Sequence, residues 1–381
     1  MSKAITIFVS AGEASGDLHG AGLVRALLLQ APGTRISCLG GRHLQEAGAT
    51  LLVNNRDVAV VGLAEVARHL QSLRHAWRTI DRYLTDHRPE LAIFIDFPDF
   101  NFLLARKARK LGCKIFYYIS PQVWAWRRGR VRTLRRLVDR MAVILPFEPE
   151  FYARYGMRVH FVGHPLLDAL EEAPTRVDAC RRYLPDGKEL LVGLLPGSRA
   201  SEVRMLLPVL LQAAARIGTA LPGVAFILPV APTLSAGDLD KQARESNTVP
   251  VQLVEGDTWG VIRACDLVLT ASGTVTLEAA ILGTPMVIIY RVSKLSEPIG
   301  RLLVKTPFIG LPNLIAGCAI SPELIQDAAN PRTLADAATA LLKDGQGLDP
   351  QRQELAAIRA QLGQPGAAER AARLALELVG L

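Results

Sequence analysis

Two carboxylates, Asp96 and Asp99, follow an apolar strand-like segment that ends near residue 97. A carboxylate at the end of a buried strand, beside Phe97 and Phe100, keeps its proton to a higher pH than in water and can act as a general base near neutral pH. For Asp99 a helix N-cap is the competing interpretation. The position at a strand end favours a catalytic role for one of the two.

Residues 266–285 form a second candidate site, with the pattern of a strand, a tight turn and a helix. The turn is Ser272-Gly273-Thr274, and the helix after it carries Thr276 in its first turn and Glu278 one turn in. The free N–H groups of a helix N-terminus suit the phosphates of a nucleotide, and Glu278 is placed to reach a ribose hydroxyl. An ordinary capped turn explains this stretch alone equally well.

A similar strand-end turn lies in the segment Leu195-Pro-Gly197-Ser198-Arg199. Gly197 and Ser198 offer backbone donors, and Arg199 offers a cation that can neutralise a diphosphate. Weak in isolation, this motif becomes informative when it lies opposite Ser272-Gly273-Thr274. Together the two turns predict a nucleotide diphosphate site.

The first strand leads through a small-residue turn, residues 11–20, into a helix. Its glycine spacing is not that of the dinucleotide fingerprint, and the second strand ends in Gly40-Gly41-Arg42 rather than in an acidic residue. The sequence therefore argues against a nicotinamide-dependent enzyme.

A third motif, which contains Trp124 and Trp126, precedes an arginine-rich helix expected from Arg127 to Arg140. The arginines are spread around that helix and lack interleaved aromatic residues for base stacking, which argues against nucleic-acid binding. Attraction to anionic lipid or to phosphate explains them equally well.

Strand and helix patterns that would position these motifs alternate through both halves of the chain, which predicts parallel sheets. The alternation breaks between His164 and Lys188, where three prolines and a short acidic stretch occur. We expect a domain over residues 1–165, a linker over 166–188 and a second domain over 189–381, whose last helices are candidates to pack back on the first. Two such domains facing across a cleft would place ligands outside the carboxyl ends of their strands.

Composition is compatible with two globular domains: the chain has 381 residues, half of them hydrophobic. Its five cysteines show no metal-ligand or redox spacing, which indicates a reducing compartment. Residues 1–165 contain 24 Lys+Arg and 13 Asp+Glu, a charge of +11, whereas residues 166–381 contain 20 and 23, a charge of −3, which together give +8. The basic first half suggests an anionic partner, either nucleic acid, a phosphorylated substrate or an acidic membrane surface.

The N-terminus enters a strand-like segment directly and shows no signal-peptide pattern, so we expect a cytoplasmic protein. Between Leu267 and Tyr290 the only charged residue is Glu278. The turn residues inside this run fit a buried strand-helix-strand unit better than a membrane span.

Taken together and in order, the motifs resemble those of the lipid-A-disaccharide synthases, inverting glycosyltransferases of the GT-B fold. The resemblance covers nearly the whole chain and rests on the following segments: Gly12-Glu13-Ala-Ser15-Gly16-Asp17, Asp96-Phe-Pro-Asp99-Phe-Asn101, Ser120-Pro-Gln122-Val-Trp124-Ala-Trp-Arg127, Gly163-His164-Pro165, Leu195-Pro-Gly197-Ser198-Arg199, Ser272-Gly273-Thr274-Val-Thr276-Leu-Glu278 and Leu311-Pro-Asn313-Leu-Ile-Ala-Gly317.

The resemblance implies transfer of 2,3-diacylglucosamine from its UDP derivative to 2,3-diacylglucosamine 1-phosphate, which forms the β-1,6-linked lipid A disaccharide 1-phosphate. It implies Asp99 as the base, with Asp96 in reserve, and neither a metal nor a cofactor. The residues implied for UDP binding are Gly197, Ser198, Arg199, Ser272, Gly273, Thr274, Thr276, Glu278 and Asn313. Those implied for the acceptor side are Gly12, Glu13, Ser15, Gly16, Asp17, His19, Gln122, Trp124 and His164. For His19 a packing or helix-capping role is equally compatible.

The chain departs from the family pattern at Cys318, where an Arg is expected, so a phosphate contact from that position is in doubt. The lipid substrates also suggest that the run Val58–Leu63 and the following helix, about Leu63 to Leu84, dock on the inner face of the inner membrane. That helix has an apolar stripe that is also expected of a core helix: Leu63, Val66, Leu70, Leu73, Trp77, Ile80 and Leu84. A homodimer is compatible with the sequence.

Two alternatives remain at this stage. One is another UDP-sugar enzyme of the same fold, such as the synthase that adds N-acetylglucosamine to a peptidoglycan lipid precursor, or a nucleotide-sugar epimerase. The other is a non-catalytic module that binds nucleic acid or membrane through residues 127–140.

Overall fold

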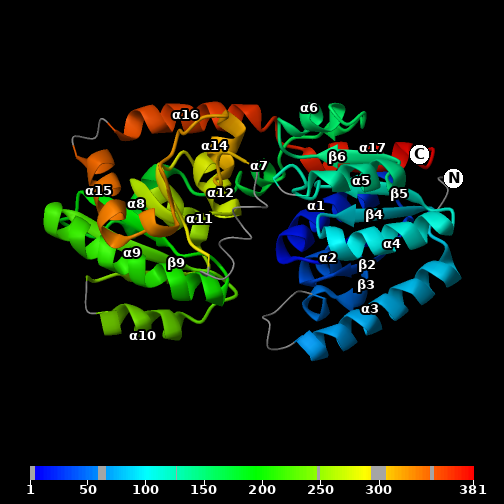
Figure 1. Cartoon of the computed structure of the whole chain (residues 1–381), viewed down its shortest axis with the longest axis horizontal. Coiled ribbons are helices and arrows are strands. Elements are labelled where there is room, and N and C mark those ends of the chain that lie inside the picture. The colour runs from blue at the N-terminus through cyan, green and yellow to red at the C-terminus, as the bar shows by residue number, and fades with distance from the viewer. Residues whose placement is uncertain (1–4, 59–65, 126, 247–248, 293–305, 344–346) are drawn as a thin grey trace. The chain divides into compact units, whose positions relative to one another are not determined.

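The computed structural model describes residues 5–58, 66–125, 127–246, 249–292, 306–343 and 347–381. The chain divides into two compact units, each built around one parallel sheet (Figure 1). Unit 1 comprises Met1–Asp168 and Leu362–Leu381, and unit 2 comprises Ala169–Gln361. The predicted architecture of two doubly wound α/β domains is therefore confirmed.

Unit 1 contains a seven-stranded sheet in the order β3-β2-β1-β4-β5-β6-β7. Its strands are β1 (Thr6–Ala11), β2 (Arg35–Gly40), β3 (Thr50–Asn54), β4 (Leu91–Ile95), β5 (Lys114–Tyr118), β6 (Arg140–Val143) and β7 (His160–Phe161). The strand order reverses between β1 and β4, which pair in parallel. At such a switch point the loops after the two strands diverge and leave room for a ligand at the carboxyl edge.

The helices of unit 1 cover both faces of this sheet. They are α1 (Ala14–Gln30), α2 (Arg42–Glu46), α3 (Val66–His87), α4 (Pro98–Lys110), α5 (Val131–Leu137), α6 (Glu148–Ala153), α7 (Leu166–Ala169, at the boundary) and α17 (Ala367–Glu377), with 3₁₀ turns η1 (Asn55–Asp57) and η3 (Arg128–Arg130). In the stripe expected on the long helix, Ile80 and Leu84 are fully buried, and Leu73 and Trp77 pack against the same core. This part of α3 is therefore a core element. Residues 59–65 lie outside the described residues, so the expected membrane-docking run is not described beyond Val58.

Unit 2 contains a six-stranded sheet in the order β10-β9-β8-β11-β12-β13. The strands are β8 (Leu190–Leu195), β9 (Val224–Val230), β10 (Gln252–Glu255), β11 (Leu267–Ala271), β12 (Met286–Tyr290) and β13 (Glu323–Ile325). The helices are α8 (Arg176–Tyr183), α9 (Ala200–Ala220), α10 (Ala236–Ser246), α11 (Thr258–Ala264), α12 (Thr274–Leu282), α14 (Leu311–Ala316), α15 (Pro331–Leu342) and α16 (Leu348–Gln361), with the 3₁₀ turn η4 (Gln326–Ala328). Its switch point lies between β8 and β11, the strands that carry the two predicted phosphate-binding turns.

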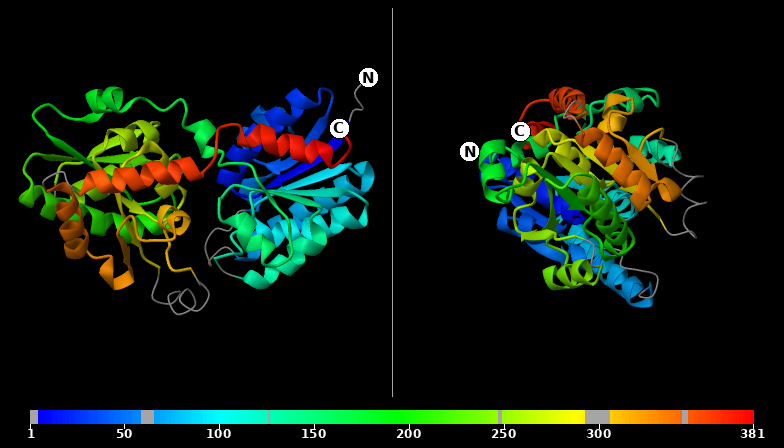
Figure 2. Two further views of the ribbon diagram at one scale, coloured as in Figure 1. Left: turned by 90° about the horizontal axis from the view of Figure 1, so that it is seen from above. Right: turned by 90° about the vertical axis from the view of Figure 1, so that its left-hand side faces the viewer.

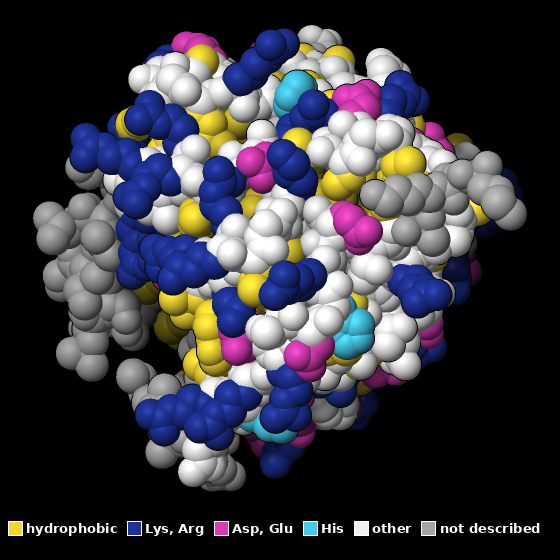
Figure 3. All heavy atoms as spheres, turned by 90° about the vertical axis from the view of Figure 1, so that its right-hand side faces the viewer, with side chains coloured by type: hydrophobic (Ala, Val, Ile, Leu, Met, Phe, Trp, Pro, Cys, Tyr) yellow, Lys and Arg dark blue, Asp and Glu magenta, His cyan; other side chains and the backbone are white. Residues whose placement is uncertain are grey.

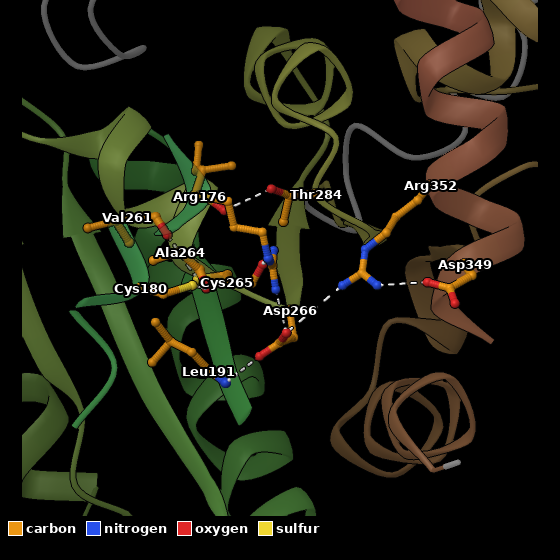
Figure 4. Close-up of polar contacts among 11 residues, drawn as sticks. Arg176, Cys180, Leu191, Val261, Ala264, Cys265, Asp266, Thr284, Asp349 and Arg352 are labelled. Carbon is orange, nitrogen blue, oxygen red and sulfur yellow. Dashed lines mark hydrogen bonds and ion pairs between the residues drawn. The ribbon is translucent and has the colours of Figure 1, made fainter. Parts of the chain in front are cut away.

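A partly buried charge cluster anchors the amino end of β11 (Figure 4). The Asp266 carboxylate accepts hydrogen bonds from Arg176 Nη2 at 2.6 Å and from the Leu191 amide at 2.9 Å. Arg352 of α16 lies 3.9 Å from the same carboxylate. These contacts tie α8, β8 and α16 to the start of β11 and so fix the strand whose other end carries Ser272.

The C-terminal helix α17 belongs to unit 1, where it packs on α1 (Figure 2). An alanine-rich face permits this close approach: Ala367, Ala368, Ala371, Ala372 and Ala375 are buried. Asp168 accepts a hydrogen bond from the amide of Gly366, and Arg140 donates to the Leu374 carbonyl at 2.9 Å. Helix α16, in contrast, packs on α12 and α14 of unit 2.

The expected linker 166–188 and the expected helix 127–140 both differ from the structure. The first contains α7 and α8, and α8 packs on α11 as part of unit 2. The second is a 3₁₀ turn and a short helix that ends at Leu137. The chain then becomes a strand because Asp139 accepts from the Ile115 amide at 2.8 Å and thereby pairs the segment with β5.

Among the described residues, α9 is the one helix long and apolar enough to cross a membrane by length and composition, and 50% of its most apolar window is buried. Nine of its side chains are buried, and they pack in the core of unit 2. Packing of this kind accounts for its composition.

Candidate active site

The turn after β4 has an unusual backbone. Asp96 (φ +42°) and Phe97 (φ +46°) both adopt the left-handed conformation, which is disfavoured for residues other than glycine. The turn is held by two hydrogen bonds to the Asp96 carbonyl, from Tyr117 Oη at 2.6 Å and from Asn101 Nδ2 at 2.9 Å. The hydroxyl of Ser10 in β1 donates to Asn101 Oδ1 at 2.6 Å. Three elements, β1, α4 and β5, thus hold the backbone of the turn at Asp96 in place.

The loop after β1 packs directly on this turn. A Cβ atom at Gly12 would lie 2.2 Å from the ring of Phe97, so only glycine fits there. The neighbouring Glu13 is exposed, yet it is close enough to Asp96 to act on its ionisation. The predicted neighbourhood of these two loops is therefore present at the switch point of unit 1.

Asp96 has the ionisation expected of a general base. Burial, together with repulsion from Glu13, raises the pKa of Asp96 to about 7, and the amide of Phe97 opposes the shift. A carboxyl with a pKa near the working pH is both partly ionised and a stronger proton acceptor than an ordinary aspartate. The geometry therefore favours Asp96 over Asp99 as the base.

Asp99 lies in a different environment three residues later. Its side chain is 72% exposed and forms ion pairs with Arg130 and, at 3.6 Å, with Arg127. Two guanidinium groups therefore occupy this carboxylate in the free protein. The sequence expectation names Asp99 as the base with Asp96 in reserve; the structure places Asp99 in an exposed ion pair and Asp96 in the turn after β4, and we propose Asp96 as the base.

Several residues expected on the acceptor side are used inside the fold. The buried Asp17 carboxylate accepts from the amides of Gly41 at 2.6 Å and His43 at 3.0 Å, and thus caps the start of α2. Trp124 is 5% exposed and packs edge-on against Phe147 at 5.1 Å. Neither side chain is presented at the surface. Gly16 is buried, whereas Ser15 and Gln122 are exposed and available to a ligand.

His19 and His164 form a pair with ring centroids 6.3 Å apart. Burial lowers the pKa of His19 to about 4 and that of His164 to about 3, with mutual repulsion contributing for His164. Both imidazoles are therefore neutral near pH 7. His164 Nδ1 accepts from the Leu166 amide at 3.2 Å, which indicates a structural role for His164 at the boundary of unit 1.

Glu148 is a buried carboxyl that the sequence did not reveal as a site. It is 1% exposed and accepts from the amides of Leu145 at 2.9 Å and Ile144 at 3.2 Å, where β6 ends. Burial raises its pKa to about 7, although hydrogen bonds from Leu145 and Ser120 oppose the shift. Glu148 begins α6, the helix that follows the apolar strand β6, and a carboxyl soon after such a strand is the signal that could have identified it.

We expect Glu148→Gln to change the pH dependence of stability. The pKa is higher in the folded than in the unfolded chain, so Glu148 stabilises the fold at low pH and loses this contribution as the pH rises through about 7. Between pH 5.5 and 8 the wild type should lose about 2 kcal/mol more than the variant. Denaturant unfolding at both pH values measures the difference, and equal pH dependences would contradict the assignment.

In unit 2, the predicted turn after β11 begins the helix α12. Gly273 (φ +155°) is the N-cap, and Thr276 Oγ1 donates to its carbonyl at 2.7 Å. Ser272 Oγ donates to the Ile309 carbonyl at 3.0 Å, which holds the turn in place. The amides of Thr274 and Val275 precede the first helical hydrogen bond and are therefore oriented to receive an anion.

The turn after β8 lies beside it at the same switch point. Gly197 has φ +105°, a conformation that other residues rarely adopt, so its replacement would strain the backbone. The Ser198 carbonyl accepts from Thr233 Oγ1 at 2.5 Å. Arg199 is 73% exposed and pairs with Glu202 at 2.8 Å. The loop is thus shaped from within, while its cation remains accessible.

Glu278 and Asn313 lie in contrasting environments. Burial raises the pKa of the half-buried Glu278, whose carboxylate receives an opposing hydrogen bond from Trp259. Asn313 is fully buried, and its amide donates to Glu323 Oε1 at 2.8 Å while its oxygen accepts from the Ser321 amide at 2.9 Å. Asn313 therefore positions the loop 309–323. Cys318, which follows helix α14 (Leu311–Ala316), is exposed.

The described part of the chain contains no group of three or more His, Cys, Asp or Glu side chains placed to hold a metal ion. The groups available for chemistry are thus the carboxylate of Asp96 in unit 1 and the amides, cation and carboxylate around α12 in unit 2. This combination suits removal of a proton from one substrate and stabilisation of a diphosphate on another.

Comparisons with known proteins show the family to which the chain belongs. The lipid-A-disaccharide synthetase family model matches residues 7–378. The chain is 47% identical over 373 residues to the lipid-A-disaccharide synthase of Syntrophus aciditrophicus, with 98% of this chain and 97% of the relative covered. It is 45% identical over 374 residues to that of Geobacter sulfurreducens, with the same coverages.

Solved structures agree at the level of the fold. MurG of Acinetobacter baumannii matches with a TM-score of 0.60 at 12% identity, covering 98% of this chain and 100% of the other. Neighbours of this kind have the GT-B fold of two Rossmann-like domains. The full-length match to one family, together with the motifs at both switch points, identifies this chain as a glycosyltransferase of the lipid-A-disaccharide synthase family.

Proposed function

We propose that this enzyme transfers 2,3-diacylglucosamine from UDP-2,3-diacylglucosamine to 2,3-diacylglucosamine 1-phosphate, with inversion at the anomeric carbon. The products are the β-1,6-linked disaccharide 1-phosphate and UDP. The observation that carries the proposal is the pair of switch-point sites: a half-buried carboxylate with a pKa of about 7 after β4 and a helix N-terminus after β11.

In this reaction Asp96 removes the proton of the acceptor 6-hydroxyl as its oxygen attacks the anomeric carbon. An inverting transfer needs one such base, and the raised pKa of Asp96 allows it to accept a proton near neutral pH. The rigid turn around Asp96 fixes the direction of its side chain, which lowers the cost of orienting the reacting groups.

The leaving UDP acquires negative charge as the glycosidic bond breaks. The amides of Thr274 and Val275, together with Arg199, are placed to stabilise the diphosphate oxygens. Glu278, one turn along α12, is placed to accept hydrogen bonds from the ribose hydroxyls. Ser272 holds its turn through the bond to the Ile309 carbonyl, and Gly197 and Gly273 give the two turns their backbone conformations.

An assay of UDP release with matched substrates tests this function. Release should require both the diacylated UDP donor and the diacylated 1-phosphate acceptor. Equal release from plain UDP-N-acetylglucosamine would contradict the proposal and favour a different sugar-nucleotide enzyme of the same fold. Mass spectrometry of the lipid product verifies that the disaccharide 1-phosphate has formed.

We further propose that the enzyme acts in the cytoplasm, peripherally on the inner face of the inner membrane, because both sugars carry acyl chains. Lys and Arg side chains, in dark blue, outnumber Asp and Glu on the face drawn in Figure 3, with hydrophobic side chains between them. Such a surface is attracted to anionic lipid. Vesicle flotation with and without anionic lipid tests the membrane association. Sedimentation tests whether the enzyme forms a homodimer.

A further inference from the structure

Two arginines converge on one exposed carboxylate beside the catalytic turn. Arg130 Nη2 forms a hydrogen bond with Asp99 Oδ1, and Arg127 Nη1 lies 3.6 Å from the same oxygen. The two guanidinium groups and one carboxylate leave a net charge of +1. Since the Asp99 side chain is 72% exposed, this charge faces solvent.

The arginines are held in place by the surrounding fold. Arg130 is 22% exposed, its guanidinium carbon lies 5.7 Å from the centroid of the Phe102 ring, and its amide donates to the Arg127 carbonyl at 2.9 Å. Arg127 adopts a left-handed conformation (φ +57°), as Asp96, Phe97 and Ile119 do. Strained residues of this kind collect at binding and catalytic sites, and these four all follow β4 or β5.

Arg130 also lies near the residues that hold the base. It acts on the pKa of Tyr117, whose hydroxyl donates to the Asp96 carbonyl at 2.6 Å. Both arginines contact Asp99, three residues after Asp96 in the β4–α4 segment, so an anion bound by them would lie next to the turn that carries the base. A hexosamine 1-phosphate carries its phosphate on C1 and its 6-hydroxyl on the carbon attached to C5, on either side of the ring oxygen, which fits an anion site beside a base but separate from it.

An exposed ion pair stabilises a protein by at most about 1 kcal/mol, so the Asp99 contacts alone are a weak reason for two converging arginines. The planar guanidinium group matches the oxygens of a phosphate in a bidentate geometry. A phosphate monoester near pH 7 has almost twice the charge of a carboxylate and three acceptor oxygens. It should therefore displace Asp99 from the two arginines.

We propose that Arg127 and Arg130 form the subsite for the 1-phosphate of the acceptor, and that Asp99 occupies this subsite in the free enzyme. The inference rests on the proposed function for the identity of the acceptor. Under it, Asp99 is an internal competitor that pairs with the two arginines until the phosphate displaces it. The subsite then makes the enzyme specific for an acceptor that carries a phosphate.

Steady-state kinetics with two acceptors test the subsite: 2,3-diacylglucosamine 1-phosphate and the same sugar without the phosphate. Arg130→Met retains an apolar stem over Phe102 and removes the charge. We expect its KM for the phosphorylated acceptor to rise about 10- to 100-fold, with the KM for the other acceptor unchanged. Arg130→Lys should recover only part of the loss, because an ammonium lacks the bidentate geometry.

Arg109→Met is the matched control. Arg109 also forms an ion pair with a carboxylate, that of Asp139, at 3.2 Å, but it lies in the last turn of α4, whereas Asp99 lies in the first. This variant should leave both KM values unchanged. Asp99→Asn removes the internal competitor and should lower the KM for the phosphorylated acceptor while kcat is retained. An unchanged preference for the phosphorylated acceptor in Arg130→Met, or a raised KM in Asp99→Asn, would overturn the proposal.

Binding of glucosamine 1-phosphate, measured by calorimetry on the full chain, separates this inference from the proposed function. If the wild type binds this sugar and Arg130→Met does not, the subsite holds even where the diacylated substrates fail to react. If the wild type turns over the proposed substrates but the two proteins bind glucosamine 1-phosphate equally, the function holds and the subsite is wrong.

Discussion

Asp96→Asn should reduce kcat by a factor between about 10² and 10⁴, while the affinity for UDP remains unchanged. The amide cannot take the proton of the acceptor hydroxyl, so the transfer would depend on water as the base. Single-turnover measurement of disaccharide formation gives the rate of the chemical step, and calorimetry gives the affinity for UDP. Retention of the wild-type rate would show that Asp96 is not the base.

Asn is the appropriate substitution here because of the backbone. Asp96 has φ +42°, and Asn tolerates the left-handed region better than most residues. The hydrogen bonds from Tyr117 and Asn101 reach the carbonyl of residue 96 and do not depend on its side chain. The variant should therefore keep its fold and unfold near the wild-type temperature. Asp99→Asn, which changes the other carboxyl of the motif, is the matched comparison and should retain kcat.

The same assignment predicts the pH profile of the wild type. Asp96 must be ionised to accept a proton, and its pKa is raised to about 7. The value of kcat/KM should therefore rise with pH below about 7 and level off above it. Glu148 titrates in the same range, so the profile is repeated with Glu148→Gln. If kcat/KM of Glu148→Gln still falls below about pH 7, the fall reports the protonation of Asp96. If kcat/KM of this variant no longer falls, the fall in the wild type reports Glu148.

Glu278→Gln should weaken UDP binding by about 10- to 100-fold, because hydrogen bonds to a charged acceptor contribute about 1.5 to 3 kcal/mol each. The variant keeps the size of the side chain and one oxygen, so α12 should be undisturbed. Calorimetric titration with UDP measures the change. The affinity for inorganic pyrophosphate, which has no ribose, should remain the same, since the amides at the start of α12 are unaltered.

Glu255→Gln supplies the control for this second prediction. Glu255 is exposed at the end of the edge strand β10, which β9 and β8 separate from β11, and it carries the same charge. Its replacement should leave the UDP dissociation constant within about twofold of the wild type, because an exposed charge distant from the ligand contributes little. Equal affinities in all three proteins would exclude Glu278 from ribose recognition.

Local sequence was sufficient for the strand-turn-helix unit around residues 266–285. Strand β11 (Leu267–Ala271), helix α12 (Thr274–Leu282) and strand β12 (Met286–Tyr290) lie where the pattern predicts them. Apolar runs, a Ser-Gly-Thr turn and a terminal glycine all favour the same local structure there. When the local preferences agree with one another and with the fold in this way, the local structure can be predicted without knowledge of the tertiary contacts.

Local sequence was insufficient where a long-range contact decided the outcome. The helix expected to reach Arg140 ends at Leu137 because the Asp139 carboxylate accepts a hydrogen bond from the Ile115 amide in β5, 24 residues earlier in the chain. The last helix joins unit 1 because its alanine face fits α1. Periodicity shows that a helix has an apolar face, but it does not show which surface that face will contact.

The sequence by itself determined the parallel α/β class, the strand ends at which the motifs lie, and the family. These properties depend on residue types and spacing along the chain. Only the tertiary structure distinguished Asp96 from Asp99, because the pKa of a carboxyl depends on the groups that surround it in space. Glu13 and the buried turn raise the pKa of the first, while Arg127 and Arg130 hold the second as an ion pair. The two carboxylates are three residues apart in sequence, and the fold places them in opposite electrostatic environments.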